Sequence, residues 1–486
     1  MFEEGRCGLR PRVRVPFLAT APSMPMQDRR HFLKQASAFA VGFAGLHAFV
    51  GCKSLESNGR VGTIRSDPDG IFDLPEGFSY QIISRHGDPM DDGFRVPHRP
   101  DGMATFPGPD GTTLLVRNHE IDADAPREEG PFRPGGDASA SQMPADDLYD
   151  AGTQERGGLG GTTTVVYDTE QQAVRRQFVS LAGTIRNCAG GPTPWNSWLT
   201  CEETVQRAND TFARNHGYVF EVPATATMQR ATPRPITDMG RFNHEAVAVD
   251  PNSGAVYLSE DRHDGLFYRF LPEEPGALEK GGRLQACRVR EQASLDTRNW
   301  GEGPDISPGT TFEVEWMDLE NVDTPTDDLR KRGFADGAAR FAREEGMWYG
   351  DGAAYMACTN GGEIQKGQVW RYVPSPHEGT DREADQPGTL ELFVEPNDTT
   401  VLENADNLTV APWGDVIACE DGSGTDTLVG ITPDGRFYKL GRNAMSDSEL
   451  AGAVFSPDGS TLFMNIQHEG LTLAITGPWP RGGRSA

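Results

Sequence analysis

The sequence lacks the short signatures of several common metal and nucleotide sites. Its 7 cysteines include no CxxC pair, which excludes a structural zinc site of the usual spacing. There is no EF-hand loop, and His244-Glu245 lacks the HExxH spacing of a zinc protease. Gly157–Gly161 precedes an apolar run, whereas a dinucleotide-binding loop follows one. Gly422-Ser423-Gly424 is not the GxSxG turn of a serine hydrolase.

Basic residues are also scarce. The chain has 45 Lys and Arg residues against 72 Asp and Glu residues, a formal net charge of -27. Nucleic acid and anionic membrane surfaces are therefore excluded as expected partners. Most of the carboxylates are expected on a solvated surface, as in a soluble exported protein, and some are candidates for cation binding.

The N-terminal segment has no apolar run long enough to span a membrane. The apolar stretch covers only residues 36–50. It follows Arg29-Arg30, and this order is typical of a twin-arginine export signal. We therefore expect the twin-arginine export machinery as the partner of the precursor and a periplasmic or secreted mature protein. A membrane-anchoring or amphipathic helix is the alternative.

The end of this segment allows a lipid anchor. Phe49-Val50-Gly51-Cys52 loosely matches a lipoprotein cleavage box, which would place the lipid on Cys52. With 57 Gly, 35 Pro and few helical patterns, the rest of the chain favours one large all-β domain. The expected organisation is a signal segment (1–52), a polar linker (53–70), the all-β domain (71–478) and a C-terminal tail (479–486).

Few cysteines remain once the signal is removed. They are Cys188, Cys201, Cys287, Cys358 and Cys419. Their number is odd, and an exported protein permits disulfides, so two disulfides and one further thiol account for them. The further thiol is either buried and inert or a metal ligand. Cys188 fits the second role better, because it lies in a Gly/Pro-rich turn.

One strand–turn–strand unit recurs after residue 70. Its examples are Ala104–Val116, Ala246–Leu258, Leu408–Ala418 and Ala453–Met464. Asp-Gly and Asn-Ser-Gly in these units supply the positive φ that tight hairpins need. Loosely repeated antiparallel hairpins predict a β-propeller of about six blades, with a β-sandwich as the alternative. The expected insertions are residues 121–158, 274–310 and 374–390. Residues 322–345 contain helix formers and predict short helices over one propeller face.

Residues that commonly bind metals recur where these strands begin or end. Cys188 lies near Glu202-Glu203, and Glu245 begins a clean strand. Successive strand residues face opposite sides, so at most one of the paired glutamates points at a shared site. Thiolates prefer iron, zinc or copper, whereas carboxylates prefer calcium, magnesium or manganese. Together these residues predict a site for more than one kind of metal.

Arg343 and Glu345 form a further candidate pair. In an extended chain they share a face, and a guanidinium beside metal carboxylates suits a phosphoryl group. The alternative is a surface ion pair on a short helix. Glu120, Glu420 and Glu449 lie at other strand ends, where a single acidic residue more often belongs to a turn or a cap.

These motifs together resemble the PhoX family of exported bacterial phosphatases. The resemblance lies in Arg117–Glu120, Asn187–Glu203, Arg241–Asp250, Arg343–Asn360, Asp406–Asp415 and Glu449–Glu469. The most specific part is the Cys-Ala-Gly-Gly phrase, with the Thr-Pro-Trp and Leu-Thr-Cys-Glu-Glu that follow it. Glu344-Glu345-Gly346 departs from the Pro-Glu-Trp of the best-known members.

The resemblance implies a propeller with ferric iron, Fe³⁺, and calcium, Ca²⁺, at the mouth of its channel. It implies iron binding by Cys188, iron and calcium binding by Glu245 and Glu345, calcium binding by Glu203 and Glu120, further metal binding by Glu420 and Glu449, and phosphate binding by Arg343. The implied enzyme is an alkaline phosphatase that hydrolyses small phosphomonoesters with a metal-bound oxo group, hydroxide or water.

Its expected catalytic residues are Arg343, Glu345 and Cys188, and we expect a monomer. A calcium-dependent lactonase or esterase propeller and a non-enzymatic binding propeller are the alternatives. Cys188 favours the phosphatase, because a hydrolase that uses calcium alone has no need of a thiolate.

Overall fold

The computed structural model describes residues 60–132, 143–153, 157–301 and 303–480. The expected export signal, with Arg29-Arg30 and Cys52, lies outside this range. Two compact units divide the chain, Met1–Cys52 and Lys53–Ala486, and the fold below is that of the second. No helix within the described residues has the length and apolar character needed to cross a membrane.

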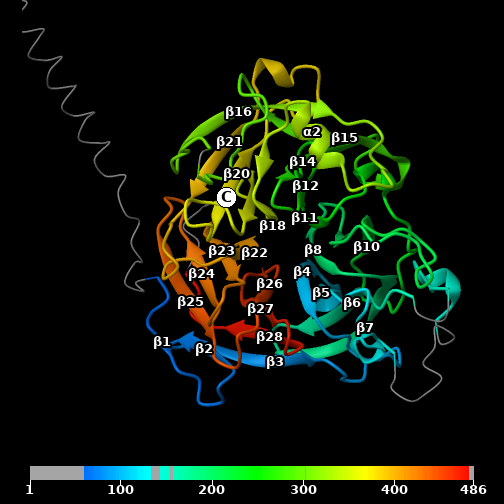
Figure 1. The fold of residues 1–486 in the computed structure, drawn as a ribbon. Helices are drawn as coiled ribbons and strands as arrows, with labels where there is room; N and C mark the ends of the chain where they lie inside the picture. Colours follow the sequence, from blue (N-terminus) through cyan, green and yellow to red (C-terminus); the bar gives the residue numbers. More distant parts are fainter. Residues whose placement is uncertain (1–59, 133–142, 154–156, 302, 481–486) are drawn as a thin grey trace, which may run out of the picture. The chain divides into compact units, whose positions relative to one another are not determined.

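The strands of the described residues form six blades around a common centre, as Figure 1 shows. One inner strand of each blade contacts the inner strands of both neighbouring blades, which closes the ring. The inner strands are β4 (Pro100–Pro107), β8 (Asn187–Pro192), β11 (His244–Val249), β18 (Glu344–Gly350), β22 (Ala405–Val410) and β26 (Leu450–Phe455). The predicted propeller is thereby confirmed.

The other strands of each blade follow outward in antiparallel order. The second strands are β5 (Thr113–His119), β9 (Ser197–Glu202), β12 (Val256–Glu260), β19 (Ala353–Cys358), β23 (Val416–Glu420) and β27 (Thr461–Ile466). The third strands are β6 (Gly160–Asp168), β10 (Val219–Pro223), β14 (Tyr268–Pro272), β20 (Gln368–Val373), β24 (Thr427–Ile431) and β28 (Leu471–Thr476). The outer strands are β7 (Ala173–Thr184), β15 (Gly282–Val289), β21 (Thr389–Val394), β25 (Phe437–Asn443) and β3 (Ser79–Arg85).

The blades numbered from β4 are not all alike. Blade 2 has three strands in the described residues, β8, β9 and β10. Blades 3 and 4 are joined into one sheet by β16 (Thr311–Asp318), which pairs with both β15 and β21. β15 corrects part of the expected insertion at 274–310, because residues 282–289 belong to blade 3.

Strands from both ends of the domain close the ring. β3 pairs with β28, so an early strand completes the last blade. β1 (Ile64–Arg65) and β2 (Phe72–Pro75) extend blade 5, since β2 pairs with β25. Residues 64–65, in the range expected to be a linker, therefore take part in a sheet.

Tight turns connect the inner and second strands where the sequence predicts them. Gly254, Gly414 and Gly459 have φ values of 75°, 91° and 70°. These positive values are left-handed backbone that glycine adopts without a steric penalty. The four predicted strand–turn–strand units accordingly coincide with β4–β5, β11–β12, β22–β23 and β26–β27.

The apolar core consists of layers between neighbouring blades. Trp198 of blade 2 lies against residues of blade 1, and Trp370 packs where blades 3 and 4 meet. Both side chains are at most 1% exposed. Each Leu or Val buried in such a layer contributes about 1.5–3 kcal/mol relative to exposure. Stability therefore depends on contacts between blades.

The cysteines correct the disulfide prediction. All five cysteines in the described part of the chain are free and buried. Cys201 and Cys419 pack in the layers between blades 2 and 3 and between blades 5 and 6, and Cys287 and Cys358 lie in the core of blades 3 and 4. These four behave as small apolar residues. Cys188 is the exception, because it lies among carboxylates at the centre.

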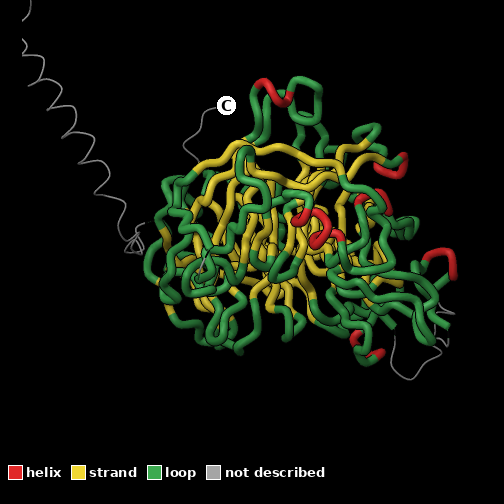
Figure 2. Tube along the Cα trace, turned by 45° about the horizontal axis from the view of Figure 1, so that its top comes forward, coloured by secondary structure: helices red, strands yellow, loops and turns green. Residues whose placement is uncertain are grey.

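Helical segments are short and contribute little, as Figure 2 shows. They are α2 (Leu329–Ala335) and the 3-10 turns η2 (Pro109–Gly111), η3 (Arg127–Glu129), η5 (Ala145–Asp147), η6 (Thr237–Met239), η7 (Leu278–Lys280) and η8 (Glu383–Asp385). The prediction of helix across 338–345 was wrong. β17 (Arg340–Phe341) pairs there with β13 (Gly265–Leu266), and β18 begins at Glu344, because sheet pairing overrides local helix propensity.

Candidate metal centre

The inner strands place metal-binding residue types at one repeated position. The second residue of five of the six inner strands is an Asp, a Glu or a Cys. These residues are Asp101, Cys188, Glu245, Glu345 and Asp406. In the sixth strand, β26, the equivalent position is Gly452, and Glu449 lies directly before the strand. The repeated inner strand thus places potential metal ligands around the axis of the propeller.

A β-bulge at this position explains why the side chains meet. The pairing register shifts between Pro100 and Met103 in blade 1 and between His244 and Val247 in blade 3. The same shift occurs in the other four blades. A bulge locally bends a strand and redirects a side chain. Six bulges at equivalent positions therefore gather the second residues near the axis.

The second strands supply further ligands at the same end. Glu120, Glu203, Asp261 and Asp421 directly follow β5, β9, β12 and β23. The end of each second strand pairs with the start of its inner strand, as Asn187 pairs with Glu202. Residues just beyond this pair therefore lie beside the bulge, next to the ligands of the inner strand.

The potential ligand atoms form four overlapping groups. Within each group they lie within 4.8 Å of one another. The groups are Asp101–Glu120–Cys188, Cys188–Glu203–Glu245, Glu245–Glu345–Asp406 and Asp406–Asp421–Glu449. Because neighbouring groups share a member, the clusters form a continuous row, which we call the acidic row. It is long enough for several cations.

The electrostatics of the acidic row fit bound cations. Glu245 is 0% exposed, and its Oε2 has no hydrogen-bond partner among the described residues. The Cys188 thiol donates to its Oε1 at 3.0 Å. Burial and the nearby Glu345 raise the pKa of Glu245 well above its ordinary value, and burial with Asp101 raises the pKa of Cys188. Cations would offset both the burial and the mutual repulsion.

The pKa values of other members of the acidic row are raised as well. Burial, aided by the neighbouring Asp421, raises the pKa of Asp406 to about 7. Burial also raises the pKa values of Glu203 and Glu345 well above their ordinary range, with further contributions from nearby carboxyl groups. The donor set, one thiol and many carboxylates, combines soft and hard ligands and thus fits two kinds of metal.

Arg343 lies beside the acidic row. Its Nε and Nη2 donate to the two carboxylate oxygens of Asp261 at 2.8 and 2.9 Å, and Nη2 also donates to Glu345 Oε1 at 2.6 Å. Its pKa is raised mainly by the nearby Glu345 and further by Asp261, whereas burial acts in the opposite direction. The short-helix alternative is wrong, because Arg343 directly precedes β18. The expected closeness to Glu345 is confirmed.

The paired glutamates separate as strand alternation predicts. Glu203 lies in the acidic row, where its Oε1 accepts from Asn243 at 2.9 Å. Glu202 faces away, and its carboxylate accepts from Ile185 N at 3.1 Å and Gly217 N at 2.9 Å. His216, between β9 and β10, bonds Glu202 at 2.6 Å and Asp150 at 3.3 Å, which ties the segment between β5 and β6 of blade 1 to blade 2.

The expected ligands at the fifth and sixth blades have different places. Glu449 lies in the acidic row. The structure does not bring Glu420 into it: its oxygens accept from Lys439 Nζ at 3.0 Å and from the Thr427 backbone N at 3.0 Å. Its neighbour Asp421 takes the place in the row instead.

Asp101, Asp261, Asp406 and Asp421 were not among the predicted ligands. A usable signal existed for two of them. Asp101 and Asp406 lie at the same distance before an alternating strand as Glu245 does. Asp261 and Asp421 follow strands, and acidic residues are common in the turns there. Only the pairing register of the strands therefore identifies them as residues of the candidate site.

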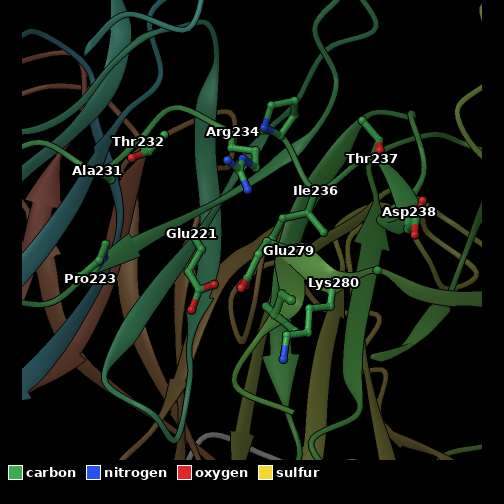
Figure 3. A pocket seen from close by; sticks show the side chains of 13 residues that line it. Glu221, Pro223, Ala231, Thr232, Arg234, Ile236, Thr237, Asp238, Glu279 and Lys280 are labelled. Atoms are coloured by element: carbon green, nitrogen blue, oxygen red, sulfur yellow. The ribbon is translucent and has the colours of Figure 1, made fainter. Parts of the chain in front are cut away.

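A hollow in the described surface lies away from the acidic row. It has a volume of about 430 Å³ and lies beside β10 and η7, at the outside of blades 2 and 3. Figure 3 shows Glu221, Arg234 and Lys280 around it. It includes no residue of the acidic row.

The fold and the acidic row define a six-bladed propeller whose inner end carries clusters of residues that could hold metal ions. A model of the family described as alkaline phosphatase PhoX matches residues 59–470. The chain therefore belongs to the alkaline phosphatase PhoX family, and it is a metal-dependent phosphomonoesterase.

The solved structure of a PhoX protein agrees with the fold. PhoX of Pseudomonas fluorescens, in complex with vanadate, a transition state analogue, has 19% sequence identity and a TM-score of 0.62, and the match covers 86% of this chain and 98% of that one. A gluconolactonase of Xanthomonas campestris has 12% identity and a TM-score of 0.35 over 82% of this chain and 98% of that one. No curated protein sequence gave a match.

Proposed function

We propose that the chain hydrolyses small phosphate monoesters at the acidic row, with ferric iron and calcium as its metals. The observation that carries this proposal is the position of the Cys188 thiol between the Asp101–Glu120 and Glu203–Glu245 carboxylates. A thiol among carboxylates has no use in a site for calcium alone, which separates this proposal from a calcium-dependent esterase. The vanadate bound to the Pseudomonas protein is consistent with phosphoryl chemistry at such a propeller.

The chain's residues divide between the two metals by ligand preference. Cys188, Glu245 and Glu345 would hold iron, because a thiolate is the softest donor of the row. Glu245 and Glu345 would also bind calcium, since both lie in a group with Asp406. Glu120 and Glu203 would serve calcium, which takes oxygen ligands. The group Asp406–Asp421–Glu449, which is the most exposed of the four, would hold a further calcium ion. Bound cations would neutralise charge that develops on the phosphoryl oxygens and lower the pKa of a water molecule.

The protein itself would bind and orient the substrate. Asp261 engages Arg343 through two hydrogen bonds and so fixes the plane of its guanidinium beside Glu345. A planar, oriented guanidinium matches the oxygens of a phosphoryl group. Phosphomonoester hydrolysis is extremely slow without a catalyst, so stabilisation of transition-state charge is the main task of the site.

The proposal is tested by metal analysis of protein purified without chelator. We expect iron and calcium in the same preparation, and loss of phosphomonoesterase activity when EGTA removes calcium, with recovery on adding it back. Calcium removal should also lower thermal stability, because ligands of the folded state stabilise by about 2.7 kcal/mol at a hundredfold excess over Kd. Full activity of protein shown to contain neither metal would reject the proposal.

We further propose that the protein reaches the periplasm or the exterior through twin-arginine export. Arg29-Arg30 and the short apolar stretch after them support this route. Cleavage before Cys52 would place a lipid on this residue after export, and we expect a monomeric mature protein.

A further inference from the structure

The inner strands share one more repeated position, two residues before the ligand. In blades 1, 2 and 4 it holds Arg99, Arg186 and Arg343. All three residues have the same left-handed backbone, with φ of 48°. For a residue with a side chain this conformation is uncommon and strained. Its recurrence shows that the propeller imposes one geometry on these three arginines.

Arg186 also repeats the contacts of Arg343. Arg186 Nη2 forms ion pairs with Glu203 and, at 2.9 Å, with Glu120 Oε1, just as Arg343 pairs with Glu345 and Asp261. Glu120, Glu203 and Glu345 belong to the acidic row, and Asp261 lies beside it. Each arginine is thus paired with carboxylates at this site. The side chains are equally accessible, at 35% exposed for Arg186 and 33% for Arg343.

We propose that Arg186 is a second residue that binds the phosphoryl group of the substrate, acting with Arg343 from the other side of β11. This inference rests on the proposed function. Arg343 approaches the group of Glu245, Glu345 and Asp406, whereas Arg186 approaches the groups of Cys188. A phosphoryl group bound at the acidic row would lie between the guanidinium groups of Arg186 and Arg343.

The simpler role for Arg186 is neutralising Glu120 and Glu203. Cations on these carboxylates would take over that role, and the guanidinium would then face the substrate. Arg99 is a matched control. It has the same backbone geometry, but its guanidinium hydrogen bond in the described residues goes to the neutral amide oxygen of Gln467, at 3.4 Å.

The experiment compares Arg186→Ala, Arg186→Lys, Arg343→Ala and Arg99→Ala in the metal-loaded full-length protein. Inorganic phosphate is the probe, measured as a competitive inhibitor, together with kcat, KM and metal content. Arg186→Ala should raise the phosphate inhibition constant and lower kcat/KM, each by about 10- to 100-fold. Arg99→Ala should change both by less than about threefold.

Arg186→Lys separates binding geometry from charge. If Arg186 grips the phosphoryl group, lysine should restore metal content while phosphate inhibition stays weakened, because lysine lacks the planar fork. Restoration of both by lysine, or an unchanged inhibition constant in Arg186→Ala, would overturn the inference. If Arg343→Ala alone weakens inhibition, only this inference fails. If neither variant does, the phosphate-binding part of the proposed function fails as well.

Discussion

At the scale of single residues, the acidic row differs from an ordinary acidic surface through Cys188. Its side chain is 7% exposed, and its thiol lies in two of the four groups of potential ligands. Burial among carboxylates raises the pKa of this thiol, which opposes a free thiolate. A metal cation is the partner that would stabilise the thiolate here, because direct coordination deprotonates a thiol.

Replacing Cys188 should therefore affect one metal more than the other. Cys188→Ser should lower iron affinity by at least about 10-fold and leave calcium content near normal, because the carboxylates remain. Elemental analysis and any visible absorption of the native protein are the measurements. Cys419→Ala is the control, since that thiol packs in the core and should leave iron unchanged. Equal iron in wild type and Cys188→Ser would show that the thiol is not a ligand.

At the scale of elements, the bulges of the inner strands need small residues where strands approach each other. A Cβ built on Gly346 would lie 2.7 Å from the Asn407 Cα and 2.8 Å from the Asp406 backbone oxygen. Gly102 has a similar contact, 2.6 Å from the Ala189 Cα. Backbone cannot move aside as a flexible side chain can. These glycines therefore set the spacing of neighbouring inner strands and of the ligands that they carry.

Gly346→Ala should push β18 and β22 apart and with them Glu345 and Asp406. We expect a loss of about 1–3 kcal/mol in the free energy of unfolding and weaker binding of the cation between these carboxylates. Gly424→Ala is a matched control, because a Cβ there has no atom within 4 Å and its φ is not in the left-handed region. Thermal melts and calcium titrations of both variants are the measurements. Wild-type calcium affinity in Gly346→Ala would contradict this account of the spacing.

At the scale of the whole molecule, the ring closes only when both ends of the domain are present. β3, near residue 80, pairs with β28, which ends at Thr476. The acidic row likewise combines Asp101 of the first blade with Glu449 before the last inner strand. The metal centre is thus complete only in the fully synthesised, folded chain. This requirement suits an export route that carries folded proteins.

The twin-arginine proposal predicts dependence on Arg29 and Arg30. Replacing both by lysine should leave folded, metal-containing precursor in the cytoplasm, because the export machinery reads the arginine pair. Fractionation and activity of each compartment are the measurements. Lysine at Arg12 and Arg14 is the control, as these arginines lie outside the pair. Undiminished export of the Arg29/Arg30 variant would exclude this route.

Local patterns in the sequence were sufficient for the hairpins and for several ligands. Alternating apolar residues around Asp-Gly and Asn-Ser-Gly predicted β11–β12 and β26–β27. The residue type at the start of β11 marked Glu245, and the Gly/Pro-rich phrase around Cys188, now in β8, marked that thiol. Both signals depend on residues close in sequence, because turn geometry and strand alternation are local properties. Helix propensity at 338–345 was equally local and misleading, since the strand pairing there is with distant residues.

Only the tertiary structure decided which residues meet. Asp101 Oδ2 accepts a hydrogen bond from Gln467 Nε2 at 2.7 Å across 366 positions of sequence, and no local pattern contains that contact. The same holds for Asp421 in place of Glu420, which depends on the pairing register of β22 and β23. The free cysteines are a further example, because the apolar layers in which they are buried form only when neighbouring blades pack together. Composition and periodicity therefore determined the blades and the kinds of potential ligand, while closure of the ring determined the candidate metal centre, because its potential ligands come from all six blades.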